Sequence, residues 1–156
     1  MRDLIPCSDL LRKLDVLPAT FQLWQNAGLV PRVRRRNAKR YYTEEEAFLI
    51  TVISELSKGR LLKVGTRGLD ECCRSFIKDI EGNNRFAVCK IVYHNKSLID
   101  AEWVLSDSAT IPPKQHIVEA CGDSALNVTI SFDLKAAYDL MTAKLFNGAG
   151  EGLYSQ

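Results

Sequence analysis

The chain of 156 residues can hold one or two small domains, and its content of 46% hydrophobic and 26% charged residues is ordinary for a globular protein rather than a disordered one. No secretory signal is apparent near the start, and the longest apolar run, residues 47–53, is too short to span a bilayer. The five cysteines form no C-x-x-C pair, which favours a reducing compartment over a disulfide framework. We therefore expect a cytoplasmic protein without a membrane segment.

The charge is distributed unevenly along the chain, although its net value is only +2. Residues 1–42 contain nine Lys or Arg and three Asp or Glu, whereas the remainder contains twelve basic and sixteen acidic residues. A basic first part joined to a mildly acidic second part is typical of an anion-binding module attached to a partner domain.

Helical patterns dominate the chain as far as Ile80. Ser8 can cap a short helix, and after the turn "DVLP" a second helix is predicted from about Thr20 to Gly28, so that the two form a helix-turn-helix. Thr43 and Glu46 form a T-x-x-E capping box at the start of a third helix, which we expect to end at Gly59. A fourth helix is predicted over approximately residues 68–80.

The pattern changes to strands after "EGNN" at residues 81–84. Strands are predicted at residues 86–94, 97–106, 116–121 and 125–132, and a closing helix at 133–146. The apolar face of that helix consists of Leu134, Ala137, Tyr138, Met141 and Leu145. The expected fold is α+β, with a largely helical first domain at 1–80, an α+β dimerisation or effector domain at 85–146 and a flexible tail at 147–156.

A basic segment, "VPRVRRRNAKRYYTEEE", lies between the second and third helices, with six cationic residues from Arg32 to Arg40. A cationic hairpin in this position can lie against phosphates while the second helix enters the major groove. The ordered set "DVLPATFQLWQNAGLVP", "NAKRYYTEEE" and "LSKG" resembles the winged helix-turn-helix of the MerR family over residues 7–80. The long dimerisation helix of that family has no counterpart here, because strands are predicted from Phe86.

The resemblance implies roles for individual residues. Thr20 matches a phosphate-facing Thr, Trp24 an aromatic near the DNA backbone, and Arg40 and Tyr42 the Arg-x-Tyr of the wing. Gln22 stands where the family usually has Arg, and Gln can read adenine in the major groove. Ala38 replaces the usual Gly and Lys39 the usual Tyr. The expected DNA-binding residues are Thr20, Gln22, Trp24, Arg32, Arg34, Arg35, Arg36, Lys39, Arg40 and Tyr42.

Structural interpretations compete with some of these roles. The basic segment can be a solvated loop, Trp24 a half-buried core residue, and Tyr42 a packing residue of the wing. Cys72 and Cys73 invite a thiol-sensor interpretation, but beside apolar helix positions they fit inert core residues better. The Cys-x4-His and His-x4-Cys pairs on predicted strands point to opposite sheet faces, so we expect no metal site.

These patterns predict a DNA-binding regulator rather than an enzyme, because no recognisable catalytic motif accompanies the two histidines, and no cofactor is expected. The protein is predicted to act as a homodimer on a short operator in double-stranded DNA, with dimer contacts from the C-terminal domain. A fragment ending near Ile80 is then expected to be monomeric and to bind DNA more weakly. The alternatives are an excisionase- or partition-like accessory factor of a mobile element and a protein-interaction module that docks acidic partners through the basic face.

Overall fold

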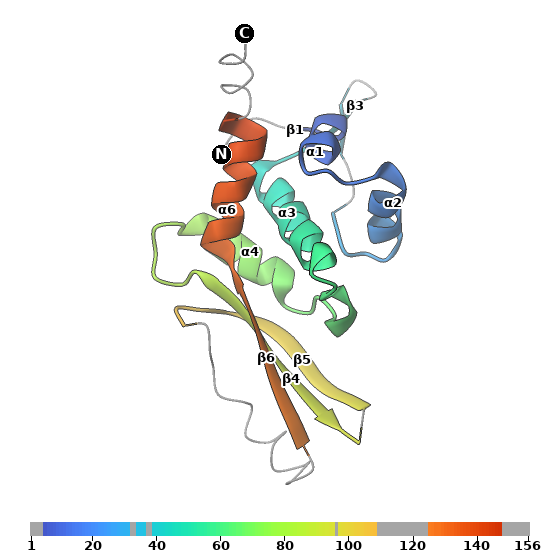
Figure 1. Ribbon diagram of the computed structural model, residues 1–156. Helices are drawn as coiled ribbons and strands as arrows, with labels where there is room; N and C mark the ends of the chain where they lie inside the picture. The colour runs from blue at the N-terminus through green and yellow to red at the C-terminus, as the bar shows by residue number, and fades with distance from the viewer. Residues whose placement is uncertain (1–4, 32–33, 37–38, 96, 109–124, 148–156) are drawn as a thin grey trace. The chain divides into compact units, whose positions relative to one another are not determined.

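A computed structural model describes residues 5–31, 34–36, 39–95, 97–108 and 125–147 of the chain. Two compact units are present: Met1–Arg60 with Ala136–Gln156 form the first, and Leu61–Lys135 form the second. The fold is α+β, as predicted (Figure 1). The compact units differ from the expected domains at 1–80 and 85–146, because residues 61–80 belong to the second unit and the chain from Ala136 belongs to the first.

The first unit contains three helices from the N-terminal part of the chain and a three-stranded antiparallel sheet of order β1-β3-β2. The elements are β1 (Ile5–Pro6), α1 (Cys7–Lys13), α2 (Pro18–Asn26), β2 (Arg34–Arg36), β3 (Lys39–Tyr42) and α3 (Glu44–Lys58). The two-residue strand β1, which the sequence did not predict, pairs with β3 through Ile5 opposite Tyr42 and Pro6 opposite Tyr41.

Prolines displace the predicted starts of the first two helices. The expectation that Ser8 caps α1 is wrong, because the N-cap is Pro6 and no side-chain cap bond forms. The second helix begins at Pro18, earlier than the predicted Thr20. Proline is favoured at the first helical position because its φ is already close to the helical value and its missing N–H would have no partner there.

The third helix begins with the predicted capping box. The backbone N–H of Glu46 donates to Thr43 Oγ1 over 3.2 Å, and the backbone N–H of Thr43 donates to Glu46 Oε1 over 2.9 Å. These two bonds satisfy amide groups that a helix start otherwise leaves unpaired. The helix ends at Lys58 with Gly59 as its C-cap, as predicted. Its Phe48, Ile50 and Ile53 are fully buried in the core of the unit.

The C-terminal helix α6 (Leu134–Thr142) continues as a π-helical turn, η3 (Ala143–Asn147), and packs against the helices of the first unit. The Tyr138 hydroxyl donates to Glu44 Oε1 over 2.7 Å, and the Tyr138 ring meets Phe48 edge-on at 5.9 Å between centroids. Met141 is fully buried and Leu145 is 7% exposed. The apolar face predicted for this helix is therefore real, but it completes the core of the helix-turn-helix unit, which the sequence assigned to residues 1–80 alone.

The second unit is a three-stranded antiparallel sheet with helix α4 (Leu69–Lys78) packed against one edge strand. Its strands are β4 (Phe86–His94), β5 (Ser97–Ser106) and β6 (Ala125–Asp133), in the order β5-β4-β6. Both partners of β4 are antiparallel to it, with Cys89 opposite Trp103 on one side and Ile130 on the other. Three predicted strands are confirmed, whereas the one predicted at 116–121 lies outside the described residues, as do positions 148–156 of the predicted tail.

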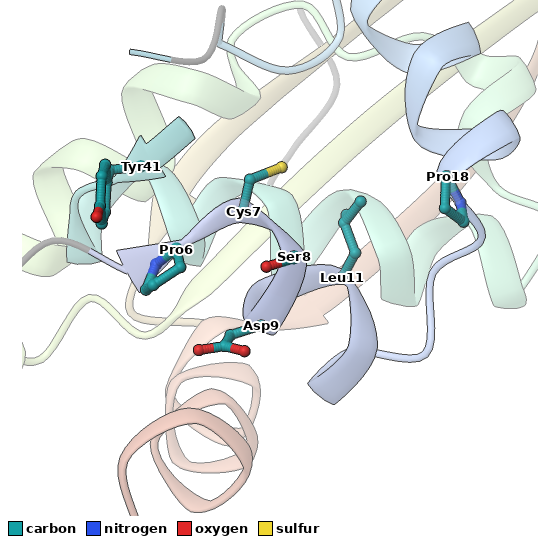
Figure 2. A pocket seen from close by; sticks show the side chains of 7 residues that line it. All are labelled: Pro6, Cys7, Ser8, Asp9, Leu11, Pro18 and Tyr41. Atoms are coloured by element: carbon teal, nitrogen blue, oxygen red, sulfur yellow. The ribbon is translucent and has the colours of Figure 1, made fainter. Parts of the chain in front are cut away.

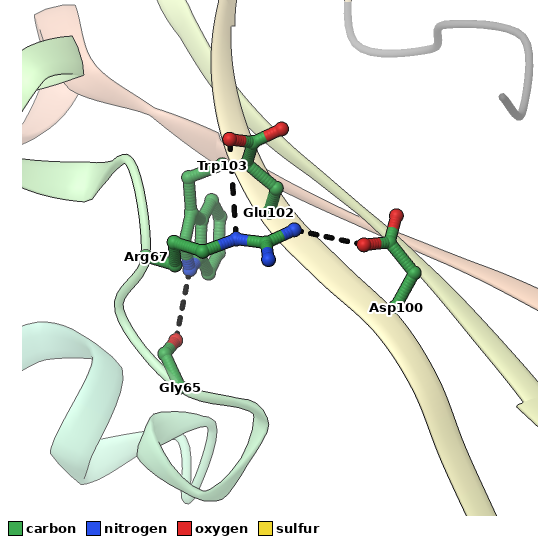
Figure 3. A network of polar contacts seen from close by, with 5 residues as sticks. All are labelled: Gly65, Arg67, Asp100, Glu102 and Trp103. Atoms are coloured by element: carbon green, nitrogen blue, oxygen red, sulfur yellow. Dashed lines mark hydrogen bonds and ion pairs between the residues drawn. The ribbon is translucent and has the colours of Figure 1, made fainter.

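The loop before α4 is fixed to strand β5 by the bonds of one tryptophan (Figure 3). Trp103 Nε1 donates to the Gly65 carbonyl over 3.0 Å, and the Trp103 backbone N–H donates to the Arg67 carbonyl over 2.9 Å. Gly68 has a φ of +84°, and a Cβ at this position would collide with the Trp103 carbonyl oxygen. Only glycine therefore fits both the left-handed conformation and the close approach of the strand.

Cysteines contribute to the core of the second unit. Cys72 and Cys73 on α4 and Cys89 on β4 are all buried, as the interpretation of the first two as core residues predicted. Burial raises the pKa of Cys72 to about 12 and that of Cys89 to about 11, and it raises the pKa of Cys73 well above its ordinary value. Because the thiolate is the reactive and metal-binding form, the raised pKa values favour the protonated, less reactive thiol near neutral pH.

Candidate nucleic-acid interface

The basic segment forms a β-hairpin, which we call the wing and define as β2 with β3. Its register places Arg34 opposite Tyr41, Arg35 opposite Arg40 and Arg36 opposite Lys39. Five of the six predicted cationic residues therefore belong to two paired strands rather than to an irregular loop, while Arg32 lies outside the described residues. A hairpin brings these residues together within a short length of backbone, which suits contact with neighbouring phosphates.

Tyr42 joins the wing to helix α2. It is fully buried, and its hydroxyl donates to the Pro31 carbonyl over 3.2 Å and accepts from Gln25 Nε2 over 3.4 Å. Its ring meets Phe21 of α2 edge-on at 6.0 Å. The structure thus supports the packing interpretation of Tyr42, since its hydroxyl is held between the wing and α2 inside the unit.

Trp24 lies on the buried side of α2. It is only 7% exposed, and its ring meets that of Phe21 edge-on at 6.3 Å. The structure therefore places Trp24 in the core, where with Phe21 it fixes the orientation of the helix. This agrees with the core interpretation that the sequence left open beside a backbone contact.

The opposite side of α2 is exposed and carries no charge. Gln22 and Asn26 are exposed, and Gln22 Nε2 donates to Asn26 Oδ1 over 3.0 Å, one helical turn away. Leu23 is 67% exposed, and Thr20 in the first turn is partly exposed. The whole helix, "PATFQLWQN", lacks Lys, Arg, Asp and Glu. This face therefore offers amide groups and one apolar side chain, which suit base edges rather than phosphates.

A hollow with a volume of roughly 590 Å³ lies beside these elements in the first unit (Figure 2). It is lined from β1, α1, the start of α2 and the wing by Pro6, Cys7, Ser8, Asp9, Leu11, Pro18 and Tyr41. Asp9 is its charged member and pairs with Arg12 at 3.2 Å. A carboxylate in the lining disfavours phosphate there, so the hollow does not extend the anion-binding surface of the wing.

Sequence reasoning missed two features of this surface. The exposure of Leu23 follows from helical geometry, because residues 22, 23 and 26 fall opposite the buried Phe21 and Trp24 at 3.6 residues per turn. Gln25 reaches Tyr42 across 17 residues of chain. A contact of this kind depends on how the wing folds back onto α2, and no local pattern indicates it.

Two helices joined by a turn, followed by a β-hairpin and a third helix, define the class of winged helix-turn-helix domains. Residues 5–63 match the family described as MerR HTH family regulatory protein. The N-terminal part of the chain is therefore a MerR-like helix-turn-helix domain, the type of domain that binds DNA. Comparison with curated proteins gives no match. Among the described helices, none is both long and apolar enough to cross a membrane.

Proposed function

We propose that the protein is a transcriptional regulator that recognises a short operator in double-stranded DNA. The proposal rests on one observation: the first unit contains both an exposed, uncharged face of α2 and a β-hairpin rich in arginine and lysine. In this proposal Gln22 reads a base edge and Thr20 contacts a phosphate near the start of α2. Arg32, Arg34, Arg35, Arg36, Lys39 and Arg40 neutralise phosphates, while Trp24 and Tyr42 hold the helix and the wing in position.

The salt dependence of DNA binding tests the role of the wing. Each phosphate contact contributes about one unit to the slope of log affinity against log salt, so replacing Arg34, Arg35, Arg36 and Arg40 by Ala should lower the slope by about four units for each protomer bound. Arg74→Ala is the matched control, because Arg74 is an exposed arginine of the second unit. An unchanged slope in the quadruple variant would show that the wing does not contact the phosphates of DNA.

The base-reading role of Gln22 needs a separate test, since a phosphate contact and a base contact affect sequences differently. After selection of the preferred site from random DNA, Gln22→Ala should lose about 1–3 kcal/mol of discrimination at one base pair and leave the other positions unchanged. Equal weakening on every sequence would show that Gln22 contacts the backbone instead.

We propose further that the regulator works as a cytoplasmic homodimer, because two-fold symmetry doubles a short site and a reducing compartment suits its free cysteines. The apolar face of α6 is used within the first unit, which leaves the edge strands β5 and β6 as candidate contacts. Leu98 and Ile99 on β5 are 48% and 45% exposed. A monomer mass in light scattering, unchanged by operator DNA, would contradict this assembly.

Two further measurements, of DNA bending and of heparin retention, separate the alternatives. An accessory factor of a mobile element should bend its DNA and act through that bend rather than through occupancy of a promoter. A module that docks acidic proteins should be retained on heparin but show no preference among DNA sequences in the presence of competitor.

A further inference from the structure

The exposed face of α2 contains an apolar side chain that the proposed function leaves without a role. Among the large apolar residues that the structure describes, Leu17 and Leu23 are the most exposed, at 70% and 67%. Leu17 is the N-cap that precedes the helix, whereas Leu23 lies within it, next to Gln22 and on the same side as Asn26. Leu23 therefore lies on the same exposed face of α2 as Gln22 and Asn26.

An apolar group at a DNA interface needs an apolar partner, and the major groove supplies one kind. The C5-methyl of thymine projects into the groove, while the other groups presented there by the four bases are hydrogen-bond donors and acceptors. The absence of charge from α2 strengthens this match, because no Lys or Arg of the helix draws it towards phosphates instead of base edges. Burying the exposed leucine against a methyl removes apolar surface of both partners from water.

We infer that Leu23 is a specificity-determining residue that contacts the methyl group of a thymine in each half-site. This inference rests on the proposed function and deepens it, because it names the chemistry that the helix selects. Gln22 supplies the hydrogen-bonding part of recognition, for which adenine is the matching base, and Leu23 supplies the apolar part. The preferred site should therefore contain a thymine whose methyl group, rather than its hydrogen-bonding groups, is recognised.

Replacement of thymine by uracil tests the contact, since the two bases differ only by the methyl group. With the full-length protein and its selected site, each thymine is changed to uracil in turn and affinities are measured by a shift assay. At the contacted position uracil should weaken binding roughly fourfold, the change expected when one methyl-sized group is no longer buried. At the other thymines the affinity should stay unchanged.

A double-mutant cycle then assigns the methyl effect to its partner. Leu23→Ala should bind the thymine site more weakly than the wild type and lose the difference between thymine and uracil. Leu17→Ala is the matched control in the same unit, because it removes a similarly exposed leucine and should keep the full uracil effect. Because both leucines are exposed, the two variants should unfold at the wild-type temperature.

The outcomes separate the inference from the function on which it rests. Selective binding with no uracil effect at any thymine overturns the contact and leaves the regulator proposal standing. A uracil effect that persists in Leu23→Ala also overturns it, because another group then reads the methyl. A lower molecular mass of Leu23→Ala in solution, with the uracil effect intact, would place Leu23 in a protein interface. If selection yields no preferred sequence, the proposed function and the inference fail together.

Discussion

The two units differ in how the chain builds them. The second unit is one continuous stretch, Leu61–Lys135, in which neighbouring strands and the preceding helix pack on each other. The first unit combines both ends of the described chain, since α6 supplies Met141 and Tyr138 to a core formed mainly by residues before Arg60. A contiguous unit can be cut out by removing its flanks, whereas a discontinuous unit loses part of its core when either end is removed.

Their chemistry differs as well. Residues 61–135 contain nine Lys or Arg and ten Asp or Glu, and the thiols of this segment's described residues are buried with raised pKa values. In the first unit, buried aromatic residues support an exposed amide-bearing helix face and a basic hairpin. The first unit therefore presents exposed amide groups and a basic hairpin, while the thiols that the structure describes in the second unit are buried.

The largest expected effect comes from removing α6. A fragment ending at residue 80 lacks the Tyr138 side chain that contacts Glu44 and Phe48 of α3, and it also lacks the buried Met141 and Leu145. Deleting even one buried side chain of this size costs about 2–5 kcal/mol. We expect the fragment to lose cooperative thermal unfolding, whereas a 61–135 fragment should retain it. This changes the expectation drawn from the sequence, since weak DNA binding would then reflect unfolding rather than a lost dimer. Cooperative unfolding of the fragment ending at residue 80 would show that α6 is dispensable.

Trp103→Phe should lower the stability of the second unit and leave DNA binding by the first unit unchanged. The change removes the indole N–H that satisfies the Gly65 carbonyl and leaves a partly filled space at a residue only 2% exposed. We expect a loss of about 1–3 kcal/mol in the free energy of unfolding, measured by urea denaturation. DNA affinity measured well below the unfolding transition should match the wild type. A weakened affinity under those conditions would mean that the second unit affects DNA binding even while it stays folded.

Tyr42→Phe tests whether the wing depends on the buried hydroxyl. Loss of the bonds to Pro31 and Gln25 should cost about 0.5–1.5 kcal/mol of stability, the usual range for one hydrogen-bonded group. Because the hydroxyl lies inside the unit, the slope of DNA affinity against salt should be the same in the variant and the wild type. A slope lowered by about one unit would instead indicate that Tyr42 reaches a phosphate.

The smallest effect is expected for Arg67→Ala. The Arg67 side chain is 60% exposed and pairs with Asp100, whose side chain is 12% exposed, at 2.8 Å and with Glu102, whose side chain is 35% exposed, at 3.9 Å (Figure 3). Exposed ion pairs contribute about 0.2–1 kcal/mol, because solvent and salt screen them. Denaturation in low and high salt should show a difference between variant and wild type that shrinks as salt is added. A loss well above that range, unchanged by salt, would show that the side chain has a packing role.

Local signals account for what the sequence predicted well. The capping box of α3 and the strands at 86–94 and 97–106 depend on residues close together in the chain, and all three are found where they were expected. The start of α2 was misplaced because Pro18 occupies the first helical position, which proline favours. The start of α1 was misplaced because the helix begins at Cys7, after an N-cap (Pro6) that has no side-chain cap bond.

Long-range contacts could not be predicted from those signals. The apolar stripe of α6 is visible in the sequence, but nothing in it specifies whether Tyr138 meets a strand of the preceding sheet or Glu44, which is far earlier in the chain. For the candidate interface, the positions of Gln22 and the wing were predicted. The burial of Trp24 and Tyr42, by contrast, depends on how α2, the turn and the wing assemble.

The discontinuity of the first unit links the folding of the two units through chain entropy. Bringing α6 back to α3 closes a loop that contains the whole of Leu61–Lys135. When that segment is unfolded, the loop is long and flexible, and closing it costs about 0.6 kcal/mol more for each doubling of its length. When the segment is folded, the separation between its two ends is fixed. Packing α6 against α3 then costs much less chain entropy. A change that stabilises the second unit therefore also raises the fraction of molecules in which α6 is packed in the first unit, because both units belong to one chain.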